Sequence, residues 1–424
     1  MTHARLKLAL FLTYAVFAIL LNSVGTVILQ SIAHFGVDKV AASTLEAFKD
    51  LPIAVVSFLV ASFLPCIGLR RGMIAGLALV SVACLAMPML DSFAATRLLF
   101  LATGVSFALV KVATYSFVGL LTDTPHAHAA LLNAIEGVFM LGVLAGYWLF
   151  ALFIDPADPA GAGWLRVYWW LAGIAGAAIL LLLTVRFDER AAFAADDADA
   201  RPATPSGEFV AMLRLVATPL ILVFVASAFL YVLVEQGVGT WLPTINREVL
   251  GLSAPMSVQA ASIFAAGLAA GRLGAGVVVR RTGWQALLIG CLVAMAMLLV
   301  LVLPLAEAEG GRTVTSWADA PPVAYLLPLI GLCMAPIYPT LNSAILSAMP
   351  KRTQASVVGL IVVFSALGGT TGSFIVGRVF AAVGGIQAIY AMLVPIAALL
   401  VLVGLLGRLR TRDQDTDSRS SHAV

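Results

Sequence analysis

The chain has 424 residues, of which 61% are hydrophobic and only 11% are charged, and its net charge is +3. Soluble domains carry charge on roughly a quarter of their residues, so this composition excludes a water-soluble protein of this size. The basic residues form short clusters and no continuous stripe, which argues against a nucleic-acid-binding surface.

Long apolar stretches recur along the whole chain. The hydrocarbon core of a bilayer, about 30 Å thick, needs roughly 20 apolar residues in a helix. Backbone groups inside that core must be satisfied within each segment, so the stretches are predicted to be helices. The predicted spans are 7–30, 45–68, 73–90, 95–121, 129–154, 165–185, 215–245, 255–279, 284–305, 322–348, 353–381 and 385–407. The sequence therefore predicts an all-α membrane protein with twelve transmembrane helices.

A polar interval divides these spans into two sets of six. It is rich in Asp, Ala and Pro and poor in large apolar residues, which favours a linker with little order of its own. The polar C-terminal tail is expected to be similar. The predicted organisation is an N-terminal six-helix half at 1–186, a cytoplasmic linker at 187–214, a C-terminal six-helix half at 215–407 and a cytoplasmic tail at 408–424.

The charges of the loops indicate the orientation in the membrane. Lys and Arg accumulate on the cytoplasmic side of membrane proteins. Sorting by alternate loops assigns sixteen basic residues to the side of the N-terminus and six to the other side, namely Lys39, Lys49, Arg97, Arg166, Arg247 and Arg312. We therefore expect a multi-pass protein of the cell membrane, in bacteria the inner membrane, with both termini in the cytoplasm.

Pairs of small residues four apart occur in every third span. Such pairs let transmembrane backbones approach closely. The pairs are Ser57 with Ala61, Gly142 with Gly146, Gly267 with Gly271, and Gly368 with Gly372. A spacing of three spans is typical of transporters built from inverted repeats. We expect these helices to pack across the interface between two pseudo-symmetric halves.

The layout of six plus six spans and the segment "GRLGAGVVVRRTG" resemble the major facilitator superfamily. Gly276, Arg281 and Gly283 match the family's helix-loop signature, whereas Arg280 stands where the family usually has Asp. The equivalent loop after the second span, "PCIGLRRG", has Pro65 at the acidic position. The resemblance implies the major facilitator fold and alternating access, but the charge relay often ascribed to that Asp is in doubt here.

Two further segments look like the fucose, glucose and galactose proton-symporter branch of that family. They are "YVLVEQGVGTWL", which contains Glu235, and "PIYPTLNSAI", which contains Pro339 and Thr340. The resemblance implies proton-coupled symport of a small solute, a sugar, by a chain that works as a monomer. The implied partners are the solute, protons and the lipid bilayer, with no nucleic acid, cofactor or metal.

Ionisable residues inside the spans are the candidates for proton coupling. A charge at the centre of a spanning helix costs about 2.5 to 3.5 kcal/mol, so each one needs a partner or a role. Glu235 precedes two glycines and Pro243, a pattern that predicts a broken helix beside an acid. Glu136 lies at a depth similar to that of Lys111, and an ion pair between them would be either structural or functional. Asp50 is the third candidate.

Glu46 has a simpler interpretation. Ser43 and Glu46 have the spacing of a capping box, which would place them at the start of the second predicted helix. The basic residues Arg272 and Arg378 are expected to pair with acids on other helices or to extend toward the membrane surface.

Aromatic rings and amide groups inside the spans are the candidates for binding the solute. Sugars need flat stacking surfaces and groups that hydrogen-bond pairs of hydroxyls. The candidates are Asn22, Gln30, Lys111, Tyr115, Asn133, Tyr231, Gln236, Trp241, Tyr338 and Asn342. Each one taken alone is more often a packing residue or an anchor at the membrane interface than a ligand.

Other functions stay open or are disfavoured. The sequence has no phosphate-binding loop, no His-Glu-x2-His and no Gly-x-Ser-x-Gly motif, so an enzyme is not expected. Proton-antiport efflux of amphipathic compounds is an alternative. The basic residues Lys111, Arg272 and Arg378 keep an organic-anion substrate open, and a membrane sensor that transports nothing is a further alternative.

Overall fold

The computed structural model describes residues 2–122, 124–185, 216, 218–308, 313–346, 349 and 351–421. The chain divides into two compact units, unit 1 with Met1–Pro205 and Leu252–Ser262, and unit 2 with Ser206–Gly251 and Ile263–Val424. The linker predicted at 187–214 lies outside the described residues.

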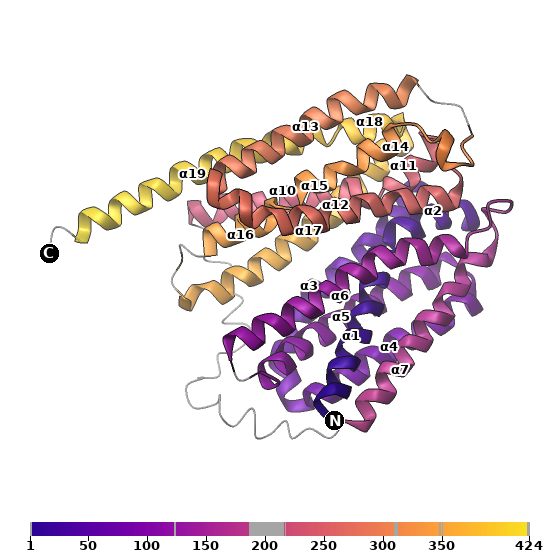
Figure 1. Cartoon of the computed structure of the whole chain (residues 1–424), viewed down its shortest axis with the longest axis horizontal. Helices are drawn as coiled ribbons and strands as arrows, with labels where there is room; N and C mark the ends of the chain where they lie inside the picture. Colours follow the sequence, from indigo (N-terminus) through magenta and orange to yellow (C-terminus); the bar gives the residue numbers. More distant parts are fainter. Residues whose placement is uncertain are drawn as a thin grey trace. The chain divides into compact units, whose positions relative to one another are not determined.

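Unit 1 is a helical bundle (Figure 1). Its elements are α1 (Thr2–Asn22), α2 (Val24–Phe35), α3 (Lys39–Ile67), α4 (Leu69–Leu90), α5 (Phe93–Leu120), α6 (Pro125–Leu152), the 3-10 helix η1 (Ala162–Arg166) and α7 (Val167–Thr184). Helix α5 packs against α3 and α4, and α1 packs against α6 and α7. Ser92 and Thr124 cap α5 and α6 by accepting hydrogen bonds from backbone amides three residues later.

Unit 2 has the same general build (Figure 1). Its elements are α10 (Pro219–Gly239), α11 (Leu242–Glu248), α12 (Ala254–Thr282), α13 (Trp284–Ala308), η2 (Trp317–Asp319), α14 (Val323–Leu326), η3 (Leu327–Leu329), α15 (Ile330–Met334), α16 (Ile337–Leu346), α17 (Lys351–Val383), α18 (Gly385–Tyr390) and α19 (Leu393–Ser421). The first turns of α12, through Ser262, group with unit 1. Helix α10 packs against α17 and α19. Helix α19 continues into the predicted tail as far as Ser421.

The predicted membrane spans agree with the helices. Among the described residues, eleven helical segments are long and apolar enough to cross a membrane, and each coincides with a predicted span. The span predicted at 45–68 lies in the 29-residue α3, which is outside that set of eleven. The chain is therefore an all-α, multi-pass membrane protein.

The first span of each unit is interrupted. In unit 2 the predicted break is confirmed, because α10 ends at Gly239 and α11 begins at Leu242 with Pro243 in its first turn. In unit 1 the expectation of one helix over 7–30 is wrong, because α1 and α2 are separated at Ser23. The Ser23 hydroxyl donates to the Leu20 carbonyl at 2.8 Å, so the side chain competes with the backbone for that acceptor.

The paired glycines do allow close packing, but within each unit. Their nearest neighbours are Ala18 for Gly142, Ile19 for Gly146, Leu332 for Gly267 and Gly271, Phe229 for Gly368, and Leu233 for Gly372. Each neighbour lies in the same unit as its glycine. The expectation that these helices pack across the interface between the two halves stays a prediction. The physical role of the glycines is to let two helix backbones of one bundle cross closely. The side chain of residue 61 lies outside the described residues.

Candidate functional site

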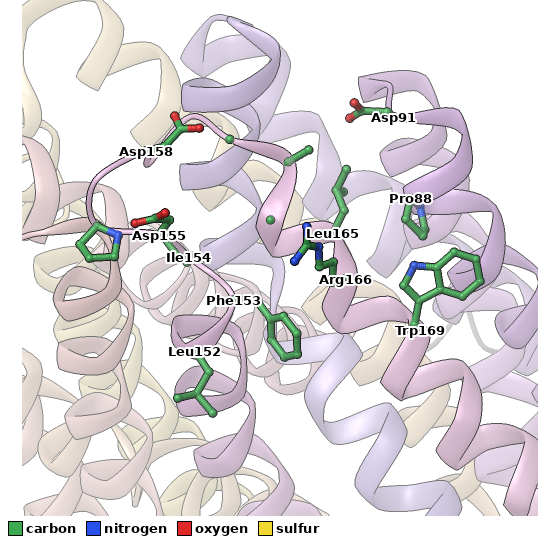
Figure 2. Close-up of a pocket in the computed structure, with 14 residues that line it drawn as sticks. Pro88, Asp91, Leu152, Phe153, Ile154, Asp155, Asp158, Leu165, Arg166 and Trp169 are labelled. Atoms are coloured by element: carbon green, nitrogen blue, oxygen red, sulfur yellow. The ribbon is translucent and has the colours of Figure 1, made fainter.

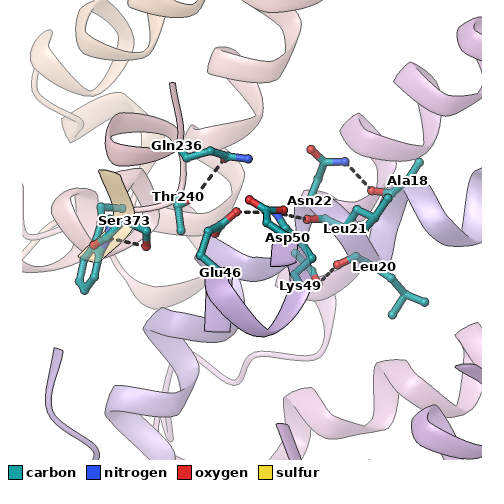
Figure 3. A network of polar contacts seen from close by, with 12 residues as sticks. Ala18, Leu20, Leu21, Asn22, Glu46, Lys49, Asp50, Gln236, Thr240 and Ser373 are labelled. Atoms are coloured by element: carbon teal, nitrogen blue, oxygen red, sulfur yellow. Dashed lines mark hydrogen bonds and ion pairs between the residues drawn. The ribbon is translucent and has the colours of Figure 1, made fainter. Parts of the chain in front are cut away.

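Three ionisable side chains share one turn of α3 in unit 1 (Figure 3). Lys49 Nζ lies 2.5 Å from Glu46 Oε1 and 3.4 Å from Asp50 Oδ1. The side chains of Glu46, Lys49 and Asp50 are 0%, 6% and 13% exposed. Charges are retained at such depth only when they are paired, so this turn is a buried ionic cluster.

Two expectations for this turn are wrong. Lys49, counted among the loop charges, is buried inside α3. The capping box of Ser43 and Glu46 is not formed, because α3 begins at Lys39 and Asp38 accepts the hydrogen bond from the Ala41 amide. The spacing of Glu46 and Lys49, at i and i+3 on a helix, is the sequence signal that could have indicated their pairing.

The ionic cluster contacts the break between α1 and α2 (Figure 3). Three carbonyls at the end of α1 accept from polar side chains: Ala18 from Asn22 Nδ2 at 2.9 Å, Leu20 from Ser23 Oγ at 2.8 Å, and Leu21 from Lys49 Nζ at 3.4 Å. The carbonyls of the last four residues of a helix lack their usual helical partner, and that of Leu21 is one of them, so it needs such a donor. The cluster therefore supports the interrupted first span.

A second polar group of unit 1 lies on α5 and α6. The Tyr115 hydroxyl donates to Glu136 Oε1 at 3.2 Å. The Lys111 ammonium lies 5.8 Å from the centre of the Phe107 ring, and the ion pair anticipated between Lys111 and Glu136 is not formed. Asn133 lies one turn before Glu136, on the same face of α6. The structure thus brings together Tyr115 and Glu136, with Lys111 near enough to interact electrostatically with Glu136.

Aromatic rings pack beside this group. Phe107 lies 6.4 Å from Tyr14, 5.6 Å from Phe17 and 6.4 Å from Phe139, measured between ring centres. Tyr14 and Phe139 are 6.0 Å apart in an edge-to-face arrangement. Nothing in the sequence distinguished these rings from the other aromatic residues of the spans. They give α1, α5 and α6 a shared aromatic surface.

In unit 2 the structure unites residues that are far apart in the sequence. The rings of Tyr231 on α10 and Tyr338 on α16 stack with their centres 5.6 Å apart and their planes 27° apart. The Tyr231 hydroxyl donates to the Met334 carbonyl at 3.1 Å and is also within hydrogen-bonding reach of Glu235. Asn342 is within reach of the Tyr338 hydroxyl, so stacking and amide groups converge here.

Glu235 has a basic partner close to the α10 break. Its Oε1 lies 4.0 Å from Arg272 Nη2 on α12, at the outer limit of an ion pair. The side chains of Glu235 and Arg272 are 20% and 47% exposed, so neither group is fully enclosed by the rest of the protein. Gln236, the next residue, accepts a hydrogen bond from the Thr240 hydroxyl at 3.3 Å. Arg378 lies over the Phe374 ring at 5.5 Å.

Three predicted solute ligands are fully buried, namely Tyr231, Trp241 and Gln30. Trp241 donates its indole N–H to the Ser373 carbonyl at 3.0 Å and packs on Phe380, so it offers no open stacking surface in this conformation. Gln30 is 1% exposed, and its amide nitrogen and oxygen have no hydrogen-bond partner among the described residues. A buried amide without partners is costly, so Gln30 can accept a polar ligand or water.

The sequence matches the model of one known family. A family model described as Major Facilitator Superfamily matches residues 8–373. The chain belongs to the major facilitator superfamily. No curated protein matches its sequence.

Solved structures share the major facilitator fold at low sequence identity. A mutant of the nucleoside transporter NupG has a TM-score of 0.74 and 13% identity, covering 95% of this chain and 99% of that one. A bacterial homologue of the human lysosomal transporter Spinster has the same TM-score and identity, with coverage of 95% and 96%. FucP, a transporter of the superfamily, has a TM-score of 0.60 and 17% identity, with coverage of 96% and 98%. At these identities the likeness shows the fold alone.

This superfamily member also has a cavity of about 810 Å³ in unit 1 (Figure 2), and none of the predicted site residues lines it. It is lined by the end of α4, the end of α6, the connection that follows α6, η1 and the start of α7, with Asp91, Asp155, Asp158, Arg166 and Trp169 among its side chains. Within the described part of the chain, no group of three His, Cys, Asp or Glu residues is placed to hold a metal ion.

His34, at the end of α2, joins three segments beside this cavity. Its Nε2 lies 2.7 Å from Asp91 Oδ1, and its Nδ1 lies 2.6 Å from the Ala160 carbonyl oxygen. A carbonyl and a carboxylate oxygen only accept, so the ring makes both hydrogen bonds when both of its nitrogens carry a proton. Burial lowers the pKa of His34, but the hydrogen bonds to Asp91 and Ala160 and the nearby charges of Asp91 and Asp158 raise it above its usual 6.5.

This contact predicts a pH dependence of stability. A raised pKa means that the stabilisation is fully present below pH 6.5 and is lost as the pH rises through the pKa of the folded protein. We expect His34→Gln to lower the free energy of unfolding by roughly 1 kcal/mol at low pH and by less at high pH. Melting temperatures measured across this range check the prediction. His126→Gln, at an exposed position of α6, is the matched control. An effect of His34→Gln that does not change with pH would contradict it.

Proposed function

We propose that this protein is a proton-coupled symporter that takes up a small polar solute, a sugar or a sugar-bearing molecule, by alternating access. One observation carries the proposal: each unit holds a carboxylate beside its interrupted first span and pairs it with a basic side chain. In unit 1 this is the cluster with Asp50 and Lys49, and in unit 2 it is Glu235 with Arg272. The proposal places the protein in the bacterial inner membrane, with both termini in the cytoplasm.

A paired carboxylate near water can exchange its partner for a proton. An ionised carboxylate in a poorly hydrated site needs a cation, whereas a protonated one does not. The separation of 4.0 Å between Glu235 and Arg272 and the exposure of both groups favour such an exchange. Glu136 accepts a hydrogen bond from the neutral Tyr115 hydroxyl, and this contact also fits a carboxylate that gains and loses a proton. Proton binding would then change which helices are held together.

The polar and aromatic groups of each unit support a hydroxyl-rich solute. Unit 2 offers the half-buried ring of Tyr338, which stacks on the buried Tyr231, with Asn342 beside it. Unit 1 offers Tyr115 with Asn133 on an adjoining exposed face, and the buried amide of Gln30. Rings that stack on the flat face of a sugar and amides that bind its hydroxyls are the chemistry expected of such a site. The structural likeness to a nucleoside transporter makes uridine a useful probe beside simple sugars.

The direct test is transport by the purified protein in proteoliposomes. We expect an inward proton gradient to drive accumulation of at least one of four probes, fucose, glucose, galactose and uridine. In Glu235→Gln, accumulation should fall to the equilibrium ratio while exchange of the solute continues, because the proton site is lost and the solute site is kept. Asp50→Asn and Glu136→Gln are tested in the same way. The matched control is Glu307→Gln, an exposed position at the end of α13.

Two outcomes would overturn the proposal. If all three variants still accumulate the solute, none of these acids carries an essential proton. If the gradient drives extrusion of an amphipathic dye and none of the four probes is accumulated, the protein is an efflux antiporter instead.

A further inference from the structure

Lys49 has three donors and three oxygen partners. Its ammonium lies 2.5 Å from Glu46 Oε1, 3.4 Å from Asp50 Oδ1 and 3.4 Å from the Leu21 carbonyl oxygen. An ammonium has three N–H bonds, so one acceptor is available for each. Two of the partners can be protonated, and the third is a backbone atom at the end of α1 (Figure 3).

The three contacts of the Lys49 ammonium differ in length. The one to Glu46 is short, whereas those to Asp50 and to the Leu21 carbonyl are equally long. A carboxyl group that takes up a proton loses its charge and much of its attraction for an ammonium. If Asp50 is protonated, the ammonium is drawn toward its two remaining oxygens, one of which is the Leu21 carbonyl. Protonation of Asp50 on α3 would therefore strengthen the hydrogen bond from Lys49 to the Leu21 carbonyl on α1.

The Leu21 carbonyl lies next to the break between α1 and α2. It lies two residues before Ser23, where the first span is interrupted. Of the three carbonyls described at this break, those of Ala18 and Leu20 are bonded by side chains of the same span, Asn22 and Ser23. That of Leu21 is bonded from another helix. The contact of Lys49 is therefore placed to control the geometry of the break.

The backbone of α3 at Lys49 packs tightly against α5. Gly104 on α5 lies against the backbone carbonyl of Lys49, so α3 cannot shift easily relative to α5. Tyr147 on α6 is a titratable group of a neighbouring helix that also interacts electrostatically with Lys49 and Glu46. Because the backbone of α3 is restrained against α5, we expect the Lys49 ammonium to move by rotation about the bonds of its side chain.

We propose that Lys49 is a positioning residue that transmits the protonation of Glu46 and Asp50 to the break between α1 and α2. The inference rests on the proposed function, in which a carboxylate of this cluster takes up the transported proton. Lys49 itself neither carries the proton nor touches the solute. It links the occupancy of the proton site to the angle between the two halves of the first span.

The test follows hydrogen exchange of the backbone amides near the break, in protein embedded in lipid nanodiscs and without any solute. After correction for the intrinsic pH dependence of exchange, protection of residues 20–27 should rise about fivefold as the pH falls, the equivalent of one added hydrogen bond. Lys49→Arg keeps the charge and should keep this rise. Lys49→Gln should abolish it. Because Lys49→Gln alone leaves two acids without their cation, the double variant Glu46→Gln/Lys49→Gln provides a second, better-compensated background.

The outcomes separate this inference from the proposed function. A wild-type pH response in Lys49→Gln, or the absence of a response in the wild type, would overturn the role of Lys49 even if uptake is proton-driven. A response that depends on Lys49 supports the role of Lys49 even if none of the four probes is accumulated, which would count against the proposed function alone. In uptake assays, Lys49→Arg should restore the pH profile that Lys49→Gln loses, which a purely structural role would not predict.

Discussion

Gly372→Ala is expected to lower the free energy of unfolding of unit 2 by about 3 kcal/mol or more, because overpacking at a backbone crossing cannot be relieved by a side-chain rotation. A Cβ atom at this position would overlap the Leu233 carbonyl oxygen and lie 2.9 Å from its Cα. Gly368, one turn earlier on α17, meets the backbone of Phe229 in the same way. Helices α10 and α17 would therefore have to separate along their contact.

Thermal unfolding of the detergent-solubilised protein, followed by tryptophan fluorescence, measures this effect. The matched control is Gly290→Ala on α13, where no heavy atom lies within 4 Å of the added Cβ. That variant should be slightly more stable, by roughly 0.5 to 1 kcal/mol, because alanine is the better helix former. Equal melting temperatures for the two variants would contradict the close crossing of α10 and α17.

Trp241→Ala is expected to cost about 3 to 5 kcal/mol of stability, the range for removing a buried aromatic side chain. The ring is completely buried and lies 5.7 Å from the Phe380 ring. Its N–H is shared by the carbonyl and hydroxyl oxygens of Ser373, at 3.0 and 3.2 Å. The substitution would leave a large cavity and remove the hydrogen bond that joins Trp241, at the break between α10 and α11, to Ser373 on α17.

The same position was predicted to bind the solute, and the variants distinguish the two roles. If Trp241 is a core residue, Trp241→Phe should lower the melting temperature by an intermediate amount and leave the KM for uptake unchanged. Trp170→Ala, at a position 63% exposed on α7, is the control and should change neither. A raised KM with an unchanged melting temperature for Trp241→Phe would instead support direct contact with the solute.

Local sequence was sufficient to predict the interruption of the seventh span. Gly237, Gly239 and Pro243 carry the signal in their own backbone properties, and the structure ends α10 at Gly239. The interruption of the first span was missed, because serine is compatible with a helix and acts here through its hydroxyl on the Leu20 carbonyl. Small-residue pairs likewise predicted that backbones approach closely. They contained no information about which backbone each would meet.

Some contacts of the candidate site could likewise be predicted from sequence spacing, whereas others required the folded chain. Tyr231 and Glu235 are one helical turn apart, so their proximity follows from sequence spacing alone. The stacking of Tyr231 on Tyr338 joins residues more than a hundred positions apart and needed the folded chain. Lys49 was placed in a loop by its charge, and only the packing of α3 shows that two acids and a backbone carbonyl compensate its burial.

Composition and the length of the apolar stretches determined by themselves that this chain is a multi-pass helical membrane protein, because a bilayer requires every backbone group to be satisfied within its own segment. That requirement is local, so a sequence displays it directly. Which partner each acid meets was decided by tertiary structure, as Glu136 with Tyr115 and Glu235 with Arg272 show. Pairing depends on helix rotation and depth, and these are set by the sum of many side-chain contacts.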